Sequence, residues 1–430
     1  MKPADTPTPL ASPLPRPHAA DAGRRRWLRQ AAGMAAAAAV PLTHATAWAS
    51  GSDAPEKTRV RVGYLPVTDC APIVMASLLG FDRKYGVTLV PTQIASWNDV
   101  AARLASGRLD FAHALYGLVY GMQLGVEGPR QDMAVLMNLS QNGQGITLSN
   151  RLQQAGVVDG ESLRKAIARG GRQYTFAQTF PTGTHAMWLY YWLASHGVDP
   201  LKEARPVTAP PARMVADTRR GAMDGFCVGE PWNARAIADG IGFSVATSQD
   251  IWADHPENVL GARQDFVNQN PNTARAVVAA IIEAGMWMEA SRENMRRSAQ
   301  VLTSRRYIEG GYNLVIGRML GHYTNGLGKS WTDKHPLRFY GGGAATFPYL
   351  SDGMWFLTQH KRWGLLREHP DYLAVARRVN RLDVYRQAAA AAGAGLPPAE
   401  MRASRLMDGT LWTGLDPAGY ADGFKIKAAA

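Results

Sequence analysis

The chain has few cysteines, and the apolar segment near its N-terminus is too short to cross a membrane. Only two cysteines, Cys70 and Cys227, occur in 430 residues. They lack the spacing of a zinc site or a redox CxxC pair, so we predict that both are free and structural. The apolar segment at residues 31–42 is well below the roughly 18 residues that a membrane-spanning helix needs. A disulfide scaffold and a membrane helix here are therefore disfavoured.

Signals of catalysis and metal binding are also missing. The histidines are scattered without the spacing of metal ligands, at positions 113, 185, 196 and 255 among others. No Ser-His-Asp order and no pair of catalytic carboxylates stands out. We therefore predict that the protein is not an enzyme and that it needs no cofactor and no metal ion.

The charge of the chain is strongly positive. Its 47 Lys and Arg residues exceed its 35 Asp and Glu residues, which gives a formal charge of +12. Such an excess suits a protein that attracts anions over a distance. It would also suit nucleic acid, but no nucleic-acid-binding motif is present. The excess is compatible with a small anion as the partner, and no nucleic acid is expected; solvated surface accounts for most of the charge.

The first 49 residues predict an export signal. Arg24 and Arg25 lie in a stretch that resembles the twin-arginine motif, and the short apolar segment follows it. Ala47 and Ala49 then provide the small residues of a cleavage site. We expect export to the periplasm by the twin-arginine route, with cleavage near Ala49.

The rest of the chain alternates between strand and helix patterns. Strands are expected at residues 60–65, 87–94, 109–114, 133–139, 173–178 and 223–229. Segments of about helix length separate them, which favours parallel pairing through helical crossovers. The pattern of helix, Gly, apolar residue, Asp and buried strand occurs at residues 99–114 and again at 213–228. Two similar α/β lobes with a cleft between them are the expected result.

A helix entrance in the second lobe is suited to an anion. Residues 173–178 form a strand, and Phe180–His185 then opens an apolar helix at residues 186–195. Backbone N–H groups at a helix start point outward, and the helix dipole adds partial positive charge there. His185 adds a side-chain donor to the same turn. This segment is predicted to hold a small anion.

Several motifs in sequence order resemble the nitrate/bicarbonate family of ABC-transporter substrate-binding proteins. They include TFPTGTHAMW, MDGFCVGEPWNARA, ASWNDV, QNGQGITLS, IGFSVATSQDIWADHPENVLG and RFYGGGAATFP. The resemblance covers nearly everything after about residue 58. It implies an α/β, two-lobed type II periplasmic-binding-protein fold (a Venus flytrap) with a helical C-terminal extension. The implied function is a monomeric periplasmic solute-binding protein that captures a small oxyanion, most simply nitrate or nitrite, for ABC permease and ATPase subunits.

The resemblance and the strand pattern together suggest a division of the chain. We expect the export signal at 1–49, lobe I at 50–149 and lobe II at 150–250. A mainly helical return to lobe I is expected at 251–386 and a C-terminal extension at 387–430. The Ala/Gly/Pro-rich stretch at 388–398 is expected to be a mobile connector.

The resemblance also implies a set of ligand-binding residues. They are Trp97, Gln144, Gly145, Gly183, Thr184, His185, Glu230 and Asn258. Trp97, just before an expected helix at residues 98–106, offers an indole N–H. Thr182, Gly183 and Thr184 are possible backbone or hydroxyl donors. Glu230 is expected to orient His185, to pair with a basic residue across the cleft, or to accept a proton from the ligand, with the first role slightly favoured.

Asn258 departs from the family pattern. Nitrate-binding relatives are expected to have Lys at this place, and losing a charge-assisted hydrogen bond costs about 1.5–3 kcal/mol. Asn can donate and accept, which an OH-bearing anion such as bicarbonate could use. A bicarbonate-binding homologue is therefore the first alternative.

Two further alternatives belong to other classes. A nitrate sensor that acts on a regulatory partner is one, although the export signal argues against it. An enzyme related to thiamin-pyrimidine synthesis proteins is the other, and the missing histidine cluster argues against that.

Overall fold

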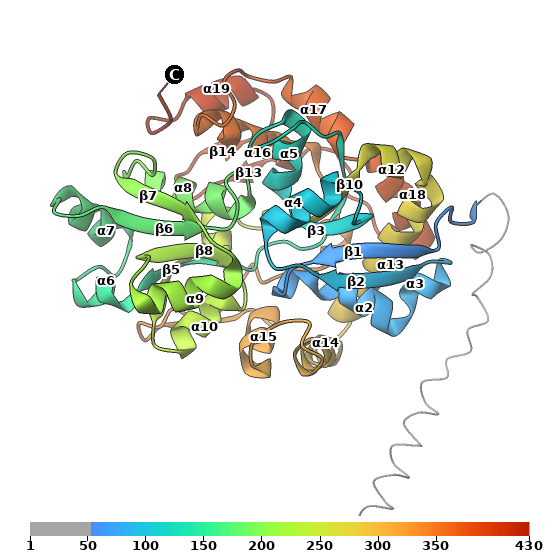
Figure 1. The fold of residues 1–430 in the computed structure, drawn as a ribbon, viewed down its shortest axis with the longest axis horizontal. Helices are drawn as coiled ribbons and strands as arrows, with labels where there is room; N and C mark the ends of the chain where they lie inside the picture. The colour runs from blue at the N-terminus through green and yellow to red at the C-terminus, as the bar shows by residue number, and fades with distance from the viewer. Residues whose placement is uncertain (1–52, 430) are drawn as a thin grey trace, which may run out of the picture. The chain divides into compact units, whose positions relative to one another are not determined.

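Two five-stranded sheets lie side by side in the computed structural model, which describes residues 53–429 (Figure 1). The predicted export signal at residues 1–49 lies outside the described residues. The first sheet has the order β2 (Thr88–Gln93), β1 (Arg59–Tyr64), β3 (Phe111–Leu115), β10 (Asn258–Arg263), β4 (Met133–Asn138). The second has the order β7 (Ala204–Thr208), β6 (Tyr174–Gln178), β8 (Gly225–Gly229), β5 (Gln144–Ser149), β9 (Gly242–Thr247).

The two sheets follow the same plan. In the first sheet β1 is parallel to β2 and β3, whereas β10 is antiparallel to β3 and β4. In the second sheet β6 is parallel to β7 and β8, whereas β5 is antiparallel to β8 and β9. The antiparallel strands are β10 in the first sheet and β5 in the second, and each begins just after the chain has crossed over from the other sheet. This topology confirms the predicted two-lobed α/β fold.

The position of β5 corrects the predicted boundary between the lobes. We placed residues up to 149 in lobe I, but Gln144–Ser149 pairs within the second sheet. The chain therefore crosses between the lobes at residues 139–143. It crosses back at residues 252–257, before β10.

The two crossing segments pair with each other. Gln141 forms an antiparallel bridge with Pro256, and the backbone N–H of Glu257 donates to the carbonyl of Ser140 (3.2 Å). The N–H of Leu139 donates to the carbonyl of Asn258 (2.7 Å). Two adjacent strands of chain thus connect the lobes, an arrangement typical of a hinge.

Short helices surround both sheets. Around the first sheet lie η2 (Thr68–Cys70), α2 (Ala71–Leu79), α3 (Phe81–Lys84), α4 (Trp97–Ala105) and α5 (Tyr116–Leu124). Around the second lie α6 (Asn150–Gln154), α7 (Gly160–Ala168), α8 (Thr184–Ser195), α9 (Pro211–Arg220), α10 (Trp232–Ala238) and α11 (Ser248–Ile251). In α4 the hydroxyl of Ser96 caps the helix by accepting from the N–H of Asp99 (3.2 Å). The helix consequently begins at Trp97, one residue earlier than predicted.

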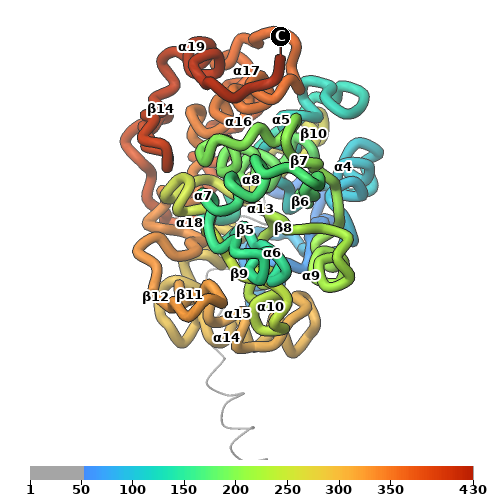
Figure 2. Tube along the Cα trace, turned by 90° about the vertical axis from the view of Figure 1, so that its left-hand side faces the viewer, coloured from blue at the N-terminus to red at the C-terminus, as the bar shows by residue number. Residues whose placement is uncertain are grey.

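After β10 the chain is mainly helical. Its elements are α12 (Gln264–Gln269), α13 (Pro271–Glu289), α14 (Arg292–Ser304), α15 (Tyr312–Met319), β11 (His322–Thr324), β12 (Ser330–Thr332), η3 (Gly341–Gly343), α16 (Leu350–Arg362), α17 (Tyr372–Val379), α18 (Leu382–Ala392), β13 (Ser404–Arg405), β14 (Leu411–Trp412) and α19 (Pro417–Asp422). Figure 2 shows α16, α17 and α19 at one end of the sheets, and α14, α15 and the β11–β12 hairpin at the other.

This region does not return to the first lobe alone. Helix α13 packs on α2 and α18, but α15 contacts α10 and α16 contacts α8, which both belong to the second lobe. The predicted mobile connector is also partly wrong, because its first five residues, 388–392, belong to α18 and pack on α13.

Cys70 and Cys227 are both buried and free, as predicted. Within residues 53–429, the helices are too short or too polar to cross a membrane.

Candidate functional site

A group of buried side chains carries polar atoms without a hydrogen-bond partner among the described residues. These atoms are Nε1 of Trp97, Nε2 of His113 and His185, and both side-chain amide atoms of Gln144 and Asn258. Each of these residues is at most 1% exposed. A buried polar group left unpaired costs about 1–3 kcal/mol, so such a group of atoms marks a place built to contact a polar ligand.

The three ring side chains lie together. Trp97 lies at the start of α4. The centroid of its ring is 5.3 Å from the ring centroid of His113 in β3 and 6.5 Å from that of His185 in α8. His113 and Trp97 come from the first lobe and His185 from the second. The structure therefore brings two predicted site residues together and adds His113, which sequence reasoning did not assign to the site.

The two amide side chains begin the two antiparallel strands. Gln144 is the first residue of β5 and pairs with Gly229 at the end of β8. Asn258 is the first residue of β10 and pairs with Leu115 at the end of β3. Strand ends of this kind are where open α/β sheets place ligands. Gly145 follows in β5, buried between Val228 and Thr247.

Hydrogen bonds to Nδ1 set the roles of the histidines. Nδ1 of His113 accepts from the backbone N–H of Leu65 (3.4 Å), so the neutral ring carries its proton on Nε2. Nδ1 of His185 is bonded to the hydroxyl of Thr179. Burial lowers the pKa of both histidines to about 3, and their mutual repulsion contributes to the lower pKa of His185. Both rings are therefore neutral at physiological pH.

Two of the predicted donors at the start of α8 are already used. The hydroxyl of Thr184 donates to Oε1 of Glu257 (2.8 Å), and the backbone N–H of Gly183 donates to the carbonyl of Phe180 (3.0 Å). These two groups are therefore paired within the protein in this structure, and the ligand-binding role of Gly183 and Thr184 stays a prediction. The backbone N–H groups of the first turn, including that of His185, have no partner within the helix.

Glu230 does not orient His185, the role that we slightly favoured. Its Oε1 accepts from Nε of Arg318 (2.8 Å), and its Oε2 accepts from the backbone N–H of Ala234 (3.0 Å). Both partners of this ion pair are buried. Glu230 pairs with a basic residue, as the second expected role had it, but Arg318 belongs to α15, which packs on α10 of the second lobe.

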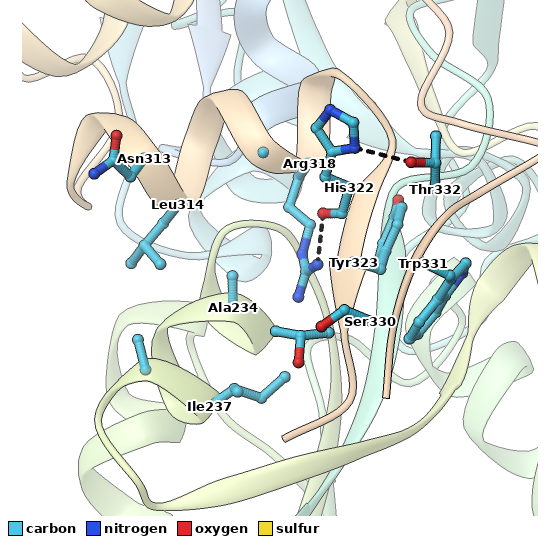
Figure 3. A pocket seen from close by; sticks show the side chains of 13 residues that line it. Ala234, Ile237, Asn313, Leu314, Arg318, His322, Tyr323, Ser330, Trp331 and Thr332 are labelled. Atoms are coloured by element: carbon cyan, nitrogen blue, oxygen red, sulfur yellow. Dashed lines mark hydrogen bonds between the residues drawn. The ribbon is translucent and has the colours of Figure 1, made fainter. Parts of the chain in front are cut away.

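Arg318 also lines a surface pocket of about 560 Å³ between α10, α15 and the β11–β12 hairpin (Figure 3). Nη1 of Arg318 donates to the carbonyl of His322 (2.9 Å), whose ring is bonded to the hydroxyl of Thr332 (3.1 Å). Arg318, His322 and Thr332 are thus paired at this pocket, and the hydroxyl of Tyr323 is its one lining group among the buried unpaired atoms of the described residues, whereas the buried cluster has several. The buried cluster is therefore the stronger candidate for the ligand site.

Comparisons with known proteins agree with this architecture. Residues 53–303 match the model of the NMT1-like family. The nitrate/nitrite binding protein NrtA of Synechocystis sp. is 37% identical over 391 residues, 88% of this chain and 87% of that protein. The bicarbonate transport ATP-binding protein CmpC of Synechocystis sp. is 33% identical over 371 residues, which is 85% of this chain but only 55% of CmpC.

A solved structure matches the fold as well. The crystal structure of the periplasmic nitrate-binding protein NrtA from Synechocystis PCC 6803 superposes with a TM-score of 0.83 at 35% identity. The match covers 86% of this chain and 100% of that one. NrtA is named as a binding protein, which agrees with the prediction that this chain is not an enzyme. On these matches, the chain belongs to the NMT1-like family and to the family of the periplasmic nitrate/nitrite-binding NrtA proteins.

Proposed function

We propose that the protein captures nitrate or nitrite between its two lobes and delivers it to the permease and ATPase of an ABC importer. The observation that carries this proposal is the cluster of buried, unpaired polar atoms on Trp97, His113, Gln144, His185 and Asn258. The nitrate-binding relatives support the choice of anion.

The chemistry of the cluster suits a small monovalent oxyanion. The oxygens of nitrate can only accept hydrogen bonds. Transfer of the ion from water into the protein is therefore favourable only if protein donors replace the water molecules around it on all sides. Nε1 of Trp97 is a pure donor, and the amide groups of Gln144 and Asn258 each supply two N–H bonds. Among the described residues no lysine is buried, and the buried Arg318 and Arg362 have partners elsewhere. Neutral donors would thus carry the recognition.

Contacts between the lobes suggest how binding and closure are coupled. Nε2 of His360 in α16 donates to the carbonyl of Thr182, just before α8 (2.8 Å). Gly117 and Gly121 of α5 face the same residue: a Cβ at Gly117 would lie 2.1 Å from that carbonyl oxygen, and one at Gly121 would lie 2.5 Å from the hydroxyl of Thr182. A ligand that contacts Trp97 and His185 at once would favour this closed arrangement.

The remaining parts of the proposal concern location and partners. Export by the twin-arginine route, with cleavage near Ala49, would place a monomer in the periplasm. The permease and ATPase subunits would be its protein partners. The relationship to the nitrate import ATP-binding protein NrtC of Synechocystis sp. supports a role in import.

A panel of anions tests the proposal. The mature protein should bind nitrate or nitrite in isothermal titration calorimetry, and either ion should raise its thermal unfolding midpoint. Chloride and sulfate at the same ionic strength serve as controls. If neither nitrate nor nitrite binds, the proposed ligand is wrong.

Bicarbonate is the second candidate. Asn258 can accept a hydrogen bond as well as donate one, so it could meet the hydroxyl of bicarbonate. CmpC, a relative named for bicarbonate transport, supports the same alternative. A midpoint that rises with bicarbonate and stays unchanged with nitrate and nitrite would favour it.

A further inference from the structure

Asp69 is a fully buried carboxyl group with one oxygen unpaired. It lies in the η2 turn after β1, and its exposed fraction is 0%. Its Oδ1 accepts from the hydroxyl of Ser140, in the first crossing segment (3.0 Å). Its Oδ2 has no hydrogen-bond partner among the described residues. A buried acceptor of this kind requires an explanation.

The unpaired oxygen lies beside the candidate site. The side chain of Asn258 lies beside Asp69 and lowers its pKa through a side-chain hydrogen-bonding interaction, although the contact is too long or poorly aligned to pair Oδ2 as a hydrogen bond. A Cβ added to Gly229 would lie 3.3 Å from Oδ2 of Asp69, and Gly229 is the cross-strand partner of Gln144. Asp69 thus lies close to Asn258 and to the strand end that pairs with Gln144.

The surroundings disfavour the ionised form of this carboxyl. No basic side-chain nitrogen of residues 53–429 forms an ion pair with Asp69. The titratable groups that face it are Cys70 on the same turn, Glu230 after β8 and Glu257 before β10. All three are acidic. Glu230 is paired with Arg318. Burial raises the pKa of Glu257 well above its usual value, and its two oxygens are bonded to the hydroxyl of Thr184 and to Nε1 of Trp188.

The nearby histidines supply no positive charge. Burial holds the pKa of each of them far below neutrality: His113, His185 and His255. Burial raises the pKa of Asp69 itself to about 7, although the hydrogen bond from Ser140 and the amide of Asn258 oppose the rise.

We propose that Asp69 is a further ligand-binding residue, whose carboxyl takes up a proton together with the anion and donates it in a hydrogen bond from Oδ2 to an oxygen of nitrate. This inference rests on the proposed function. The proton comes from solvent and stays on Asp69, and no covalent bond of the ligand changes. The site then holds a neutral donor in place of a buried carboxylate that would repel the anion.

The expected signature is proton-linked affinity. If only the protonated form binds, a pKa of about 7 makes nitrate binding about 30-fold weaker at pH 8.5 than at pH 6, because the competent fraction falls by that factor. Nitrate itself does not titrate in this range, so the change belongs to the protein. Calorimetry in two buffers of different ionisation enthalpy should show uptake of close to one proton per nitrate at pH 8.5.

Three variants locate the proton. Asp69→Asn should bind nitrate with no proton uptake and no pH dependence, because its amide N–H replaces the carboxyl donor. In Asn258→Lys the lysine should pair with the Asp69 carboxylate and cancel its repulsion, so this variant should bind nitrate through the lysine cation without proton uptake. Glu257→Gln is the matched control, because it removes a nearby buried carboxyl group other than that of Asp69. This variant should keep the proton uptake on nitrate binding.

The outcomes separate this inference from the proposed function. Nitrate binding by the unmodified protein with equal affinity at both pH values and no proton uptake overturns the role of Asp69 and leaves the proposed function standing. Uptake that is lost in Glu257→Gln and kept in Asp69→Asn also overturns it. Absence of nitrate binding at either pH overturns the proposed function, and this inference with it.

Discussion

Replacing Trp97 with phenylalanine would remove one N–H from the candidate site and keep an aromatic ring against His113 and His185. The indole Nε1 is buried and has no partner among the described residues. In the proposed complex it donates to the anion. The variant therefore tests a single hydrogen bond.

The expected effects on binding and on stability differ. A hydrogen bond to a charged partner contributes about 1.5–3 kcal/mol, so nitrate affinity should fall about 10- to 150-fold. The ligand-free protein loses ring volume but is also relieved of an unpaired buried N–H, which costs about 1–3 kcal/mol. Because these effects oppose each other, the free energy of unfolding without ligand should change by only about 1 kcal/mol.

Trp412→Phe is the matched control. Trp412 is equally buried, but its Nε1 donates to the carbonyl of Ser351 (2.9 Å). That variant should lose more stability than Trp97→Phe in urea unfolding and bind nitrate normally in calorimetry. Unchanged nitrate affinity in Trp97→Phe would refute the assignment of Trp97 to the site.

Three other substitutions test the surroundings of the site. Gly117→Ala should weaken nitrate binding at least about tenfold by blocking lobe contact, whereas Gly128→Ala, with open space around its Cβ, should not; equal affinities would remove the lobe contact from the mechanism. Arg318→Met should cost about 3–5 kcal/mol in urea unfolding by leaving Glu230 unpaired, and adding Glu230→Gln should restore part of it; no restoration would contradict the ion-pair explanation. Burial lowers the pKa of His360 to about 4, so its contribution to stability is present above its unfolded pKa of about 6.5 and is lost as pH falls toward 4. Between pH 7 and pH 5 the free energy of unfolding of His360→Gln should therefore fall by about 2 kcal/mol less than that of the unmodified protein. Equal falls would show that His360 is not buried in its neutral form.

Much of the fold could be predicted because its signals are local. Strands such as β3 and β8 are buried along their whole length, so they read as short apolar runs between turn residues. Helix α9 ends at Arg220 and is capped by Gly221, which has a φ of 79°, and such glycines mark helix ends in the sequence. The lobe boundary was misplaced because β5 pairs with strands far along the chain, and no local pattern records that partner.

The site was predictable only in part, for a similar reason. Trp97 and His185 stand in motifs that resemble the family, and the structure places their rings together. His113 and Asp69 were missed, although a polar residue inside the apolar strand LDFAHA was a signal for the first. The pairing of Glu230 with Arg318 joins residues 88 positions apart, and sequence alone could not choose Arg318 among 47 basic residues.

The most direct test of the account is a crystal structure of the mature protein grown with nitrate. We expect one nitrate ion between the lobes, with its oxygens about 3 Å from Nε1 of Trp97, Nε2 of His185 and the amide of Gln144. A nitrate ion bound elsewhere, with those three groups facing only protein or water, would contradict the central claim.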